Sequence, residues 1–191
     1  MKRMTIRSIT VSAMFMAAGL VLPFFTGQIP QIGNMLLPMH IPVLLCGLIC
    51  GWQYGLIVGF LLPLVRNMIF GMPMLFPTGI CMAFELATYG FASGWLYEHS
   101  KWKCILALYR SLIAAMLAGR VVWAFVRVVL LGVAGVEFTF TIFLMESFVN
   151  AIPGIILQLI FIPAFMVALN RTGMAHFHMM KNGYHQKKEK A

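Results

Sequence analysis

The longest uncharged segment of the chain is SITVSAMFMAAGLVLPFFTGQIPQIGNMLLPMHIPVLLCGLICGWQYGLIVGFLLPLV, which covers residues 8–65. Its 58 residues include no Lys, Arg, Asp or Glu, and a second uncharged run of 24 residues covers 147–170. One crossing of a lipid bilayer needs about 20 predominantly apolar residues. The two runs therefore predict several membrane-spanning helices.

The composition also points to a membrane protein. Of 191 residues, 61% are hydrophobic and only 10% are charged, and the mean hydropathy is +0.91. Soluble domains are nearer half apolar and a quarter charged, so the composition excludes a soluble enzyme, a disordered chain and a fibre. At about 20 residues per span with short connections, the length accommodates six or seven helices in one domain, residues 1–191. Any energy source must then be supplied by partner proteins.

Turn-forming residues divide the apolar sequence into six transmembrane helices of an all-α, polytopic fold. Glycine, proline and asparagine gather at 26–34, at a tight turn over 51–55 and at an apolar tip over 71–77, and further loops are expected at 98–103 and 132–141. The predicted helices are 8–25, 38–50, 56–70, 78–97, 104–131 and a sixth that Glu146 opens and that ends near residue 170. The second and third are short for a full crossing, which allows a tilted or re-entrant arrangement.

Basic residues indicate the orientation in the membrane. The N-terminal arm, the 98–103 loop and the tail 171–191 carry ten Lys and Arg, whereas the loops at 26–40, 66–77 and 132–146 carry only Arg66. Cytoplasmic loops are enriched in Lys and Arg, so both termini are predicted to be cytoplasmic, in a bacterial cell membrane. Because the net charge of +9 gathers at helix ends, we expect the lipid bilayer as a partner and no nucleic acid.

Apart from the flanking basic residues, which include Arg110 at the membrane edge, five charged residues lie within the predicted spans or at their outer ends: Arg66, Glu85, Arg120, Arg127 and Glu146. Inserting a charged side chain near the bilayer centre costs about 2.5–3.5 kcal/mol, so we expect each of the five to have a structural or functional role. One interpretation is structural pairing of Glu85 with Arg120 and of Glu146 with Arg127. With these two pairs formed, Arg66 has no carboxylate partner. A cavity with one positive charge in excess suits a small monoanion such as a carboxylate, which arginine binds with two hydrogen bonds.

Neutral polar residues in the same part of the sequence extend this candidate ligand site. For Tyr89 and Trp123 the alternative is packing or anchoring at the membrane interface, and for His40 it is a hydrogen-bonded position at the start of a helix. The additional candidates are Asn34, His40, Asn67, Tyr89, Trp123 and Asn150, and Gln158 is a further polar group in the last span. Motifs for nucleotide hydrolysis, zinc proteases and serine hydrolases do not occur in the sequence, so we expect no enzyme activity, no cofactor and no metal ion.

Small residues four positions apart recur along the chain. Such pairs let two membrane helices approach closely, and internal packing is the simplest interpretation for most of them. Spacing alone does not select one pair that faces a partner protein. The pairs include Ala13 with Ala17, Gly47 with Gly51, Gly55 with Gly59, and Gly90 with Gly94.

Three segments of the sequence resemble a known family: LPMHIPVLLCG at 37–47, FGMP at 70–73 and MAFELATYG at 82–90. They are similar to the substrate-binding S components of energy-coupling-factor (ECF) vitamin transporters, and most similar to the pantothenate-type group. The resemblance implies a six-helix membrane protein that captures a vitamin from outside, under the loop that follows the first helix. It also implies assembly with a transmembrane T component and two cytoplasmic ATPases, with Ala13 and Ala17 facing the T component.

The sequence therefore predicts an S component that binds a vitamin, with pantothenate as the leading ligand. Within the same class, the alternative is a neutral ligand such as pyridoxine, in which case the arginines are paired structurally. Two alternatives come from other classes. One is an intramembrane enzyme that uses Glu85 as a base, and the other is a structural subunit without a ligand.

Overall fold

The computed structural model describes residues 6–26, 38–100, 105–133 and 152–171, and these ranges contain six α-helices and no β-strand. Five of the helices are long and apolar enough to cross a membrane, whereas α3, with 11 residues, is shorter. The predicted all-α, polytopic fold is thereby confirmed. The helices are α1 (Ile6–Val21), α3 (His40–Cys50), α4 (Trp52–Phe70), α5 (Ile80–Glu98), α6 (Ile105–Val133) and α8 (Ile152–Arg171), with short helical segments at Leu22–Thr26 and Leu75–Gly79.

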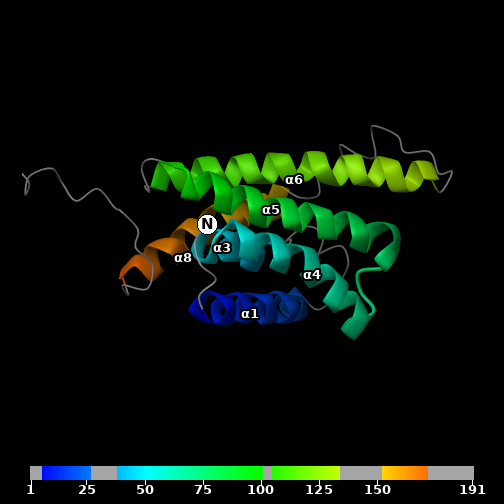
Figure 1. Ribbon diagram of the computed structural model, residues 1–191, viewed down its shortest axis with the longest axis horizontal. Coiled ribbons are helices and arrows are strands. Elements are labelled where there is room, and N and C mark those ends of the chain that lie inside the picture. Colours follow the sequence, from blue (N-terminus) through cyan, green and yellow to red (C-terminus); the bar gives the residue numbers. More distant parts are fainter. Residues whose placement is uncertain (1–5, 27–37, 101–104, 134–151, 172–191) are drawn as a thin grey trace, which may run out of the picture.

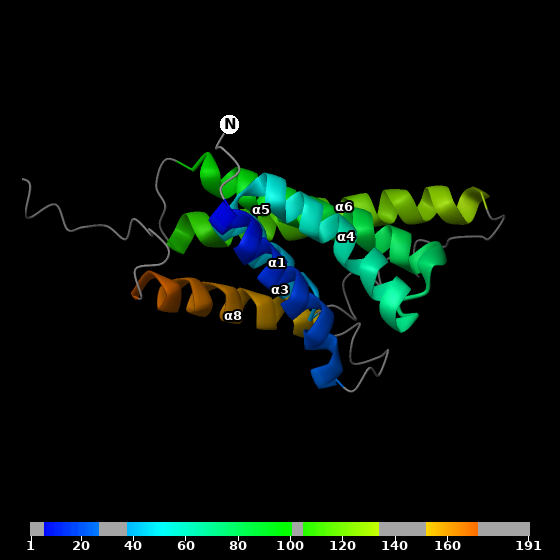
Figure 2. The same cartoon turned by 60° about the horizontal axis from the view of Figure 1, so that its bottom comes forward.

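Helix α5 lies at the centre of the bundle. It packs against α3, α4 and α6, while α1 packs against α3 and α4. Figure 1 shows α6 and α1 on opposite sides, with α3, α4 and α5 between them, and Figure 2 shows α1 crossing over α3 with α8 beyond it. A polar side chain on the inner faces of α5 is therefore surrounded by other helices and is kept away from lipid.

The predicted tight turn at 51–55 is wrong, because α4 already begins at Trp52. The break is confined to Gly51, whose φ of +107° is open to glycine and unfavourable for other residues. Gly55 is helical, and its role is in packing: a Cβ atom there would lie 2.6 Å from the Cα of Gly47 and 2.6 Å from the carbonyl oxygen of Gly90. The glycine that we had assigned to a turn is needed where α3, α4 and α5 meet.

The other helix limits in the described residues differ from the predicted ones by a few residues. The fourth helix was predicted from residue 78, whereas α5 begins at Ile80 after the short helical segment Leu75–Gly79. Gly71 ends α4 in a left-handed conformation, with φ of +70°, and its N–H donates to the carbonyl of Asn67. The start of the sixth helix, including Glu146, lies outside the described residues.

Candidate functional site

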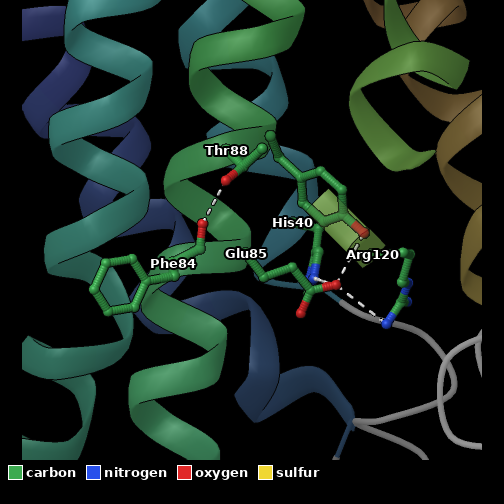
Figure 3. A network of polar contacts seen from close by, with 6 residues as sticks. His40, Phe84, Glu85, Thr88 and Arg120 are labelled. Atoms are coloured by element: carbon green, nitrogen blue, oxygen red, sulfur yellow. Dashed lines mark hydrogen bonds and ion pairs between the residues drawn. The ribbon is translucent and has the colours of Figure 1, made fainter. Parts of the chain in front are cut away.

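One carboxylate in the interior of the bundle is surrounded by donors from three helices. Glu85 on α5 is only 2% exposed, and its Oε1 accepts a hydrogen bond of 2.9 Å from the hydroxyl of Tyr89. The same oxygen lies 3.1 Å from Nη1 of Arg120 on α6 and 3.8 Å from Nε2 of His40 at the start of α3. Figure 3 shows His40 and Arg120 turned towards Glu85. We call these four residues the Glu85 cluster.

Local sequence explains how the Glu85 cluster forms. Glu85 and Tyr89 are four residues apart, so they lie on the same face of α5. Gly119, next to Arg120, has no side chain, and a Cβ atom there would collide with the ring of Tyr89. The rings of His40 and Tyr89 have centroids 5.1 Å apart. The close approach of α6 to Tyr89 thus depends on Gly119 and brings the Arg120 guanidinium within reach of Glu85.

The Glu85 cluster confirms one of the two structural pairs that the sequence suggested, because Glu85 and Arg120 form a buried ion pair. The ion pair leaves other polar atoms of the Glu85 cluster without a hydrogen-bond partner in the described residues. Within the described part of the chain, Nε and Nη2 of Arg120 and both ring nitrogens of His40 are buried without a hydrogen-bond partner. An unsatisfied buried polar group costs about 1–3 kcal/mol, so these atoms indicate a place for polar atoms of a bound solute, with acceptors facing the Arg120 nitrogens.

A further buried polar group lies on α8. Gln158 is 1% exposed, and its Nε2 finds no hydrogen-bond acceptor among the residues that the structure describes. It shares the buried face of α8 with Gly154 and Ile162, at intervals of four residues. The sequence showed Gln158 as a polar residue in an uncharged run, but nothing in that run indicated which face of the helix is buried. The structure shows that Gln158 is buried, and a contact between Gln158 and a ligand stays a prediction.

We expect the substitution Gln158→Leu to stabilise the ligand-free protein and to weaken ligand binding about tenfold. The substitution removes a buried donor that pays a desolvation cost, and it would also remove the predicted hydrogen bond from Gln158 to the ligand. Thermal unfolding and equilibrium binding measure the two effects, with Gln53→Leu on the partly exposed part of α4 as the matched control. A lower unfolding midpoint with unchanged affinity would instead assign Gln158 to packing alone.

The side chains of Arg66 and Asn67 donate hydrogen bonds to backbone carbonyls, two of them in the segment 71–77 that follows α4. Arg66 donates from Nε to the carbonyl of Met72 at 3.2 Å and from Nη1 to the carbonyl of Leu20 at 3.3 Å. Asn67 donates from Nδ2 to the carbonyl of Pro73 at 2.7 Å. Leu20 lies in the last turn of α1, where carbonyls lack helical partners and a cation is favourable. These contacts tie α4 to the end of α1 and to the tip.

The contacts of the Arg66 guanidinium thus account for its burial without a bound ligand. Its guanidinium also lies 6.0 Å from the ring centroid of Phe24 and 5.9 Å from that of Phe70, distances typical of cation–π contacts. The sequence counted Arg66 as the excess positive charge of a cavity, and a contact between Arg66 and a ligand stays a prediction. The same holds for Asn67.

Arg127 lies seven residues beyond Arg120, on the same face of α6. Its guanidinium carbon is 4.8 Å from the ring centroid of Trp123, a buried residue. Trp123 thus packs inside the protein against Arg127, and a contact between Trp123 and a ligand stays a prediction. The remaining candidates, Asn34, Glu146 and Asn150, lie outside the described residues, so the predicted pairing of Glu146 with Arg127 stays a prediction.

The apolar helices and the buried Glu85 cluster define the class of protein: a multi-pass membrane protein with a polar site in its interior. A family model described as "ECF transporter, substrate-specific component" matches residues 7–182, and the chain therefore belongs to this family. Members of the family are substrate-capture subunits of ECF transporters and not enzymes. Comparisons with curated proteins and with solved structures found no match.

Proposed function

We propose that this S component captures a small organic monoanion, with pantothenate as the leading candidate, from outside a bacterial cell. The observation that carries this proposal is the guanidinium of Arg120. Its Nη1 is paired with Glu85, while Nε and Nη2 have no acceptor in the described structure. These two nitrogens form one edge of the guanidinium, which matches the two oxygens of a carboxylate.

The balance of charges supports an anion. Apart from the charged residues near the cytoplasmic helix ends, Arg7, Glu98, Arg110 and Arg171, the described helices carry three arginines, Arg66, Arg120 and Arg127, and one carboxylate, Glu85. Because Arg66 serves two backbone carbonyls, the excess charge near the Glu85 cluster comes from α6, which presents Arg120 and Arg127 on one face. His40 and Tyr89 offer further polar atoms beside the carboxylate for hydroxyl or amide groups of the ligand.

A neutral ligand such as pyridoxine is the alternative in the same class, and it is favoured by a different feature of the cluster. Glu85 and Arg120 neutralise each other, and a neutral solute could use the ring nitrogens of His40 without any need for excess charge. The family makes the enzyme hypothesis for Glu85 unnecessary. A structural subunit without a ligand would leave the unsatisfied buried donors unexplained.

Equilibrium binding of radiolabelled pantothenate to the purified chain, with pyridoxine and riboflavin as competitors, tests the proposal. We expect saturable binding that neither competitor displaces, and we expect Arg127→Gln to weaken pantothenate binding at least tenfold, because it removes a positive charge from the same helix face. Arg7→Gln, at an exposed position on α1, is the matched control. Displacement of pantothenate by pyridoxine, or wild-type affinity in Arg127→Gln, would reject the anionic ligand.

The proposed partners are a T component and two cytoplasmic ATPases. Helix α1 supports a contact with another membrane helix, because Ala13 and Ala17 are exposed on it while Ser12, Phe15 and Gly19 on the opposite side are buried in the bundle. Two alanines four residues apart let a neighbouring helix approach closely. The T component would pack on this exposed face of α1.

A further inference from the structure

An apolar groove lies between α6 and α8, away from the Glu85 cluster. Its volume is about 560 Å³. It exists because α8 presents the small side chains of Ala164 and Ala168 to the first turns of α6, where larger residues would close the gap. The walls are Ile105 and Tyr109 on α6, and Ile160, Pro163, Ala164 and Val167 on α8.

The groove begins near the first residue of α6 and the last turn of α8, and it follows the surface between the two helices. Ile105 is the first residue of α6, and Ala168 lies three residues before the end of α8 at Arg171. From Ala168 to Ile160 the groove follows eight residues of α8, which corresponds to about 12 Å at 1.5 Å per residue. One leaflet of hydrocarbon is about 15 Å thick, half of the usual 30 Å. The length and the apolar lining of the groove therefore suit an acyl chain.

Basic residues lie close in sequence to the walls of the groove. Arg110 follows the wall residue Tyr109 and is exposed, and because side chains on a helix tilt towards its N-terminus, its long side chain has the reach to contact a headgroup near the first turn of α6. In the sequence, Lys101 and Lys103 precede α6, and Arg171 is the last residue of α8. Neither 99–136 nor 147–188 contains an Asp or Glu. The two helices of the groove thus offer an anionic headgroup no carboxylate, and the nearest one in the sequence is Glu98 at the end of α5.

We propose that this groove binds a phospholipid with an anionic headgroup, whose acyl chain lies between α6 and α8 while its phosphate contacts Arg110. The charge distribution selects an anionic lipid over a zwitterionic one, since each basic residue near the surface adds about 1 kcal/mol of attraction. The proposal rests on the multi-pass placement of the chain and not on the identity of its substrate.

Native mass spectrometry of the full chain in detergent, with phosphatidylglycerol or phosphatidylcholine of the same acyl chains, tests this site. We expect phosphatidylglycerol to bind at least fivefold more tightly. Arg110→Gln should abolish this preference, and Ala164→Trp, which fills the groove, should remove tight binding of both lipids. The matched controls are Arg7→Gln and Leu117→Trp, at exposed positions on α1 and on α6 outside the groove.

Three results would overturn the proposal. Equal binding of the two lipids by the wild-type chain would remove the role of charge, and persistent tight binding in Ala164→Trp would place the lipid elsewhere. Loss of T-component assembly in Ala164→Trp, without any change in lipid binding, would assign the groove to a protein partner. Arg110→Gln should leave the affinity for pantothenate in detergent unchanged, so failure of the lipid site and failure of the proposed vitamin site are distinguishable.

Discussion

Replacing Arg120 with glutamine is expected to lower the affinity for an anionic ligand at least 100-fold. The substitution removes the guanidinium edge formed by Nε and Nη2, which has no other partner in the described structure and is the proposed contact for the carboxylate. A loss of 100-fold corresponds to about 2.7 kcal/mol, which is within the range for a buried, charge-assisted pair of hydrogen bonds. Equilibrium binding to the purified variant provides the measurement.

The single substitution also leaves Glu85 as a buried charge without its cation, which costs about 3–5 kcal/mol and threatens the fold. The double variant Glu85→Gln with Arg120→Gln removes both charges and keeps similar volumes, so it should remain folded by thermal unfolding while its ligand affinity is still lost. Arg120→Lys keeps the charge but lacks the two-nitrogen edge, and we expect it to recover only part of the affinity. Wild-type affinity in the folded double variant would refute the proposed contact.

Replacing Gly90 with alanine is expected to cause the largest loss of stability among the glycines of the bundle. A Cβ atom at Gly90 would collide with the carbonyl group of Gly55, which belongs to the backbone of α4 and has no freedom to rotate away. Overpacking usually costs about 1–3 kcal/mol, and a backbone collision lies at the upper end of this range. Size-exclusion chromatography and the midpoint of thermal unfolding should show aggregation or a clear decrease in stability.

Gly132→Ala is the matched control for this prediction. A Cβ atom at Gly132, near the end of α6, would meet nothing within 4 Å. Alanine is favoured over glycine in a helix by about 1 kcal/mol, so this variant should unfold at the same temperature as the wild type or slightly higher. If Gly90→Ala and Gly132→Ala are equally stable, α4 and α5 are not held together by the close backbone contact at Gly55 and Gly90.

The candidate site was predicted from the sequence only as a set of residue types. Charges are so costly in a membrane that Glu85 and Arg120 stood out at once, and their pairing was one of two hypotheses. The convergence of His40 and Tyr89 on the same carboxylate was not predictable, because His40 lies 45 positions before Glu85 in the sequence. Gln158 was visible as a polar residue, but its burial depends on the rotation of α8.

Arg66 shows the limit of counting charges along a sequence. The count left Arg66 without a carboxylate, and this suggested an unbalanced charge in a cavity. The structure satisfies it with carbonyl oxygens of Met72 and Leu20 and with two phenyl rings, and none of these partners carries a charge. Backbone acceptors at helix ends are present in every chain, so the sequence could not single them out.

Apolar length, charge spacing and the positions of glycine and proline were sufficient to predict the all-α class and most limits of the helices in the described residues. The reason is that lipid offers no hydrogen bonds to the backbone. A long apolar segment in the membrane therefore satisfies its own backbone N–H and C=O groups by forming a helix. Which buried charges meet was decided by packing alone. Side-chain contacts between helices depend on how closely each helix approaches its neighbour and how it is rotated, and here Gly55, Gly90 and Gly119 permit the approaches that bring α4, α5 and α6 together.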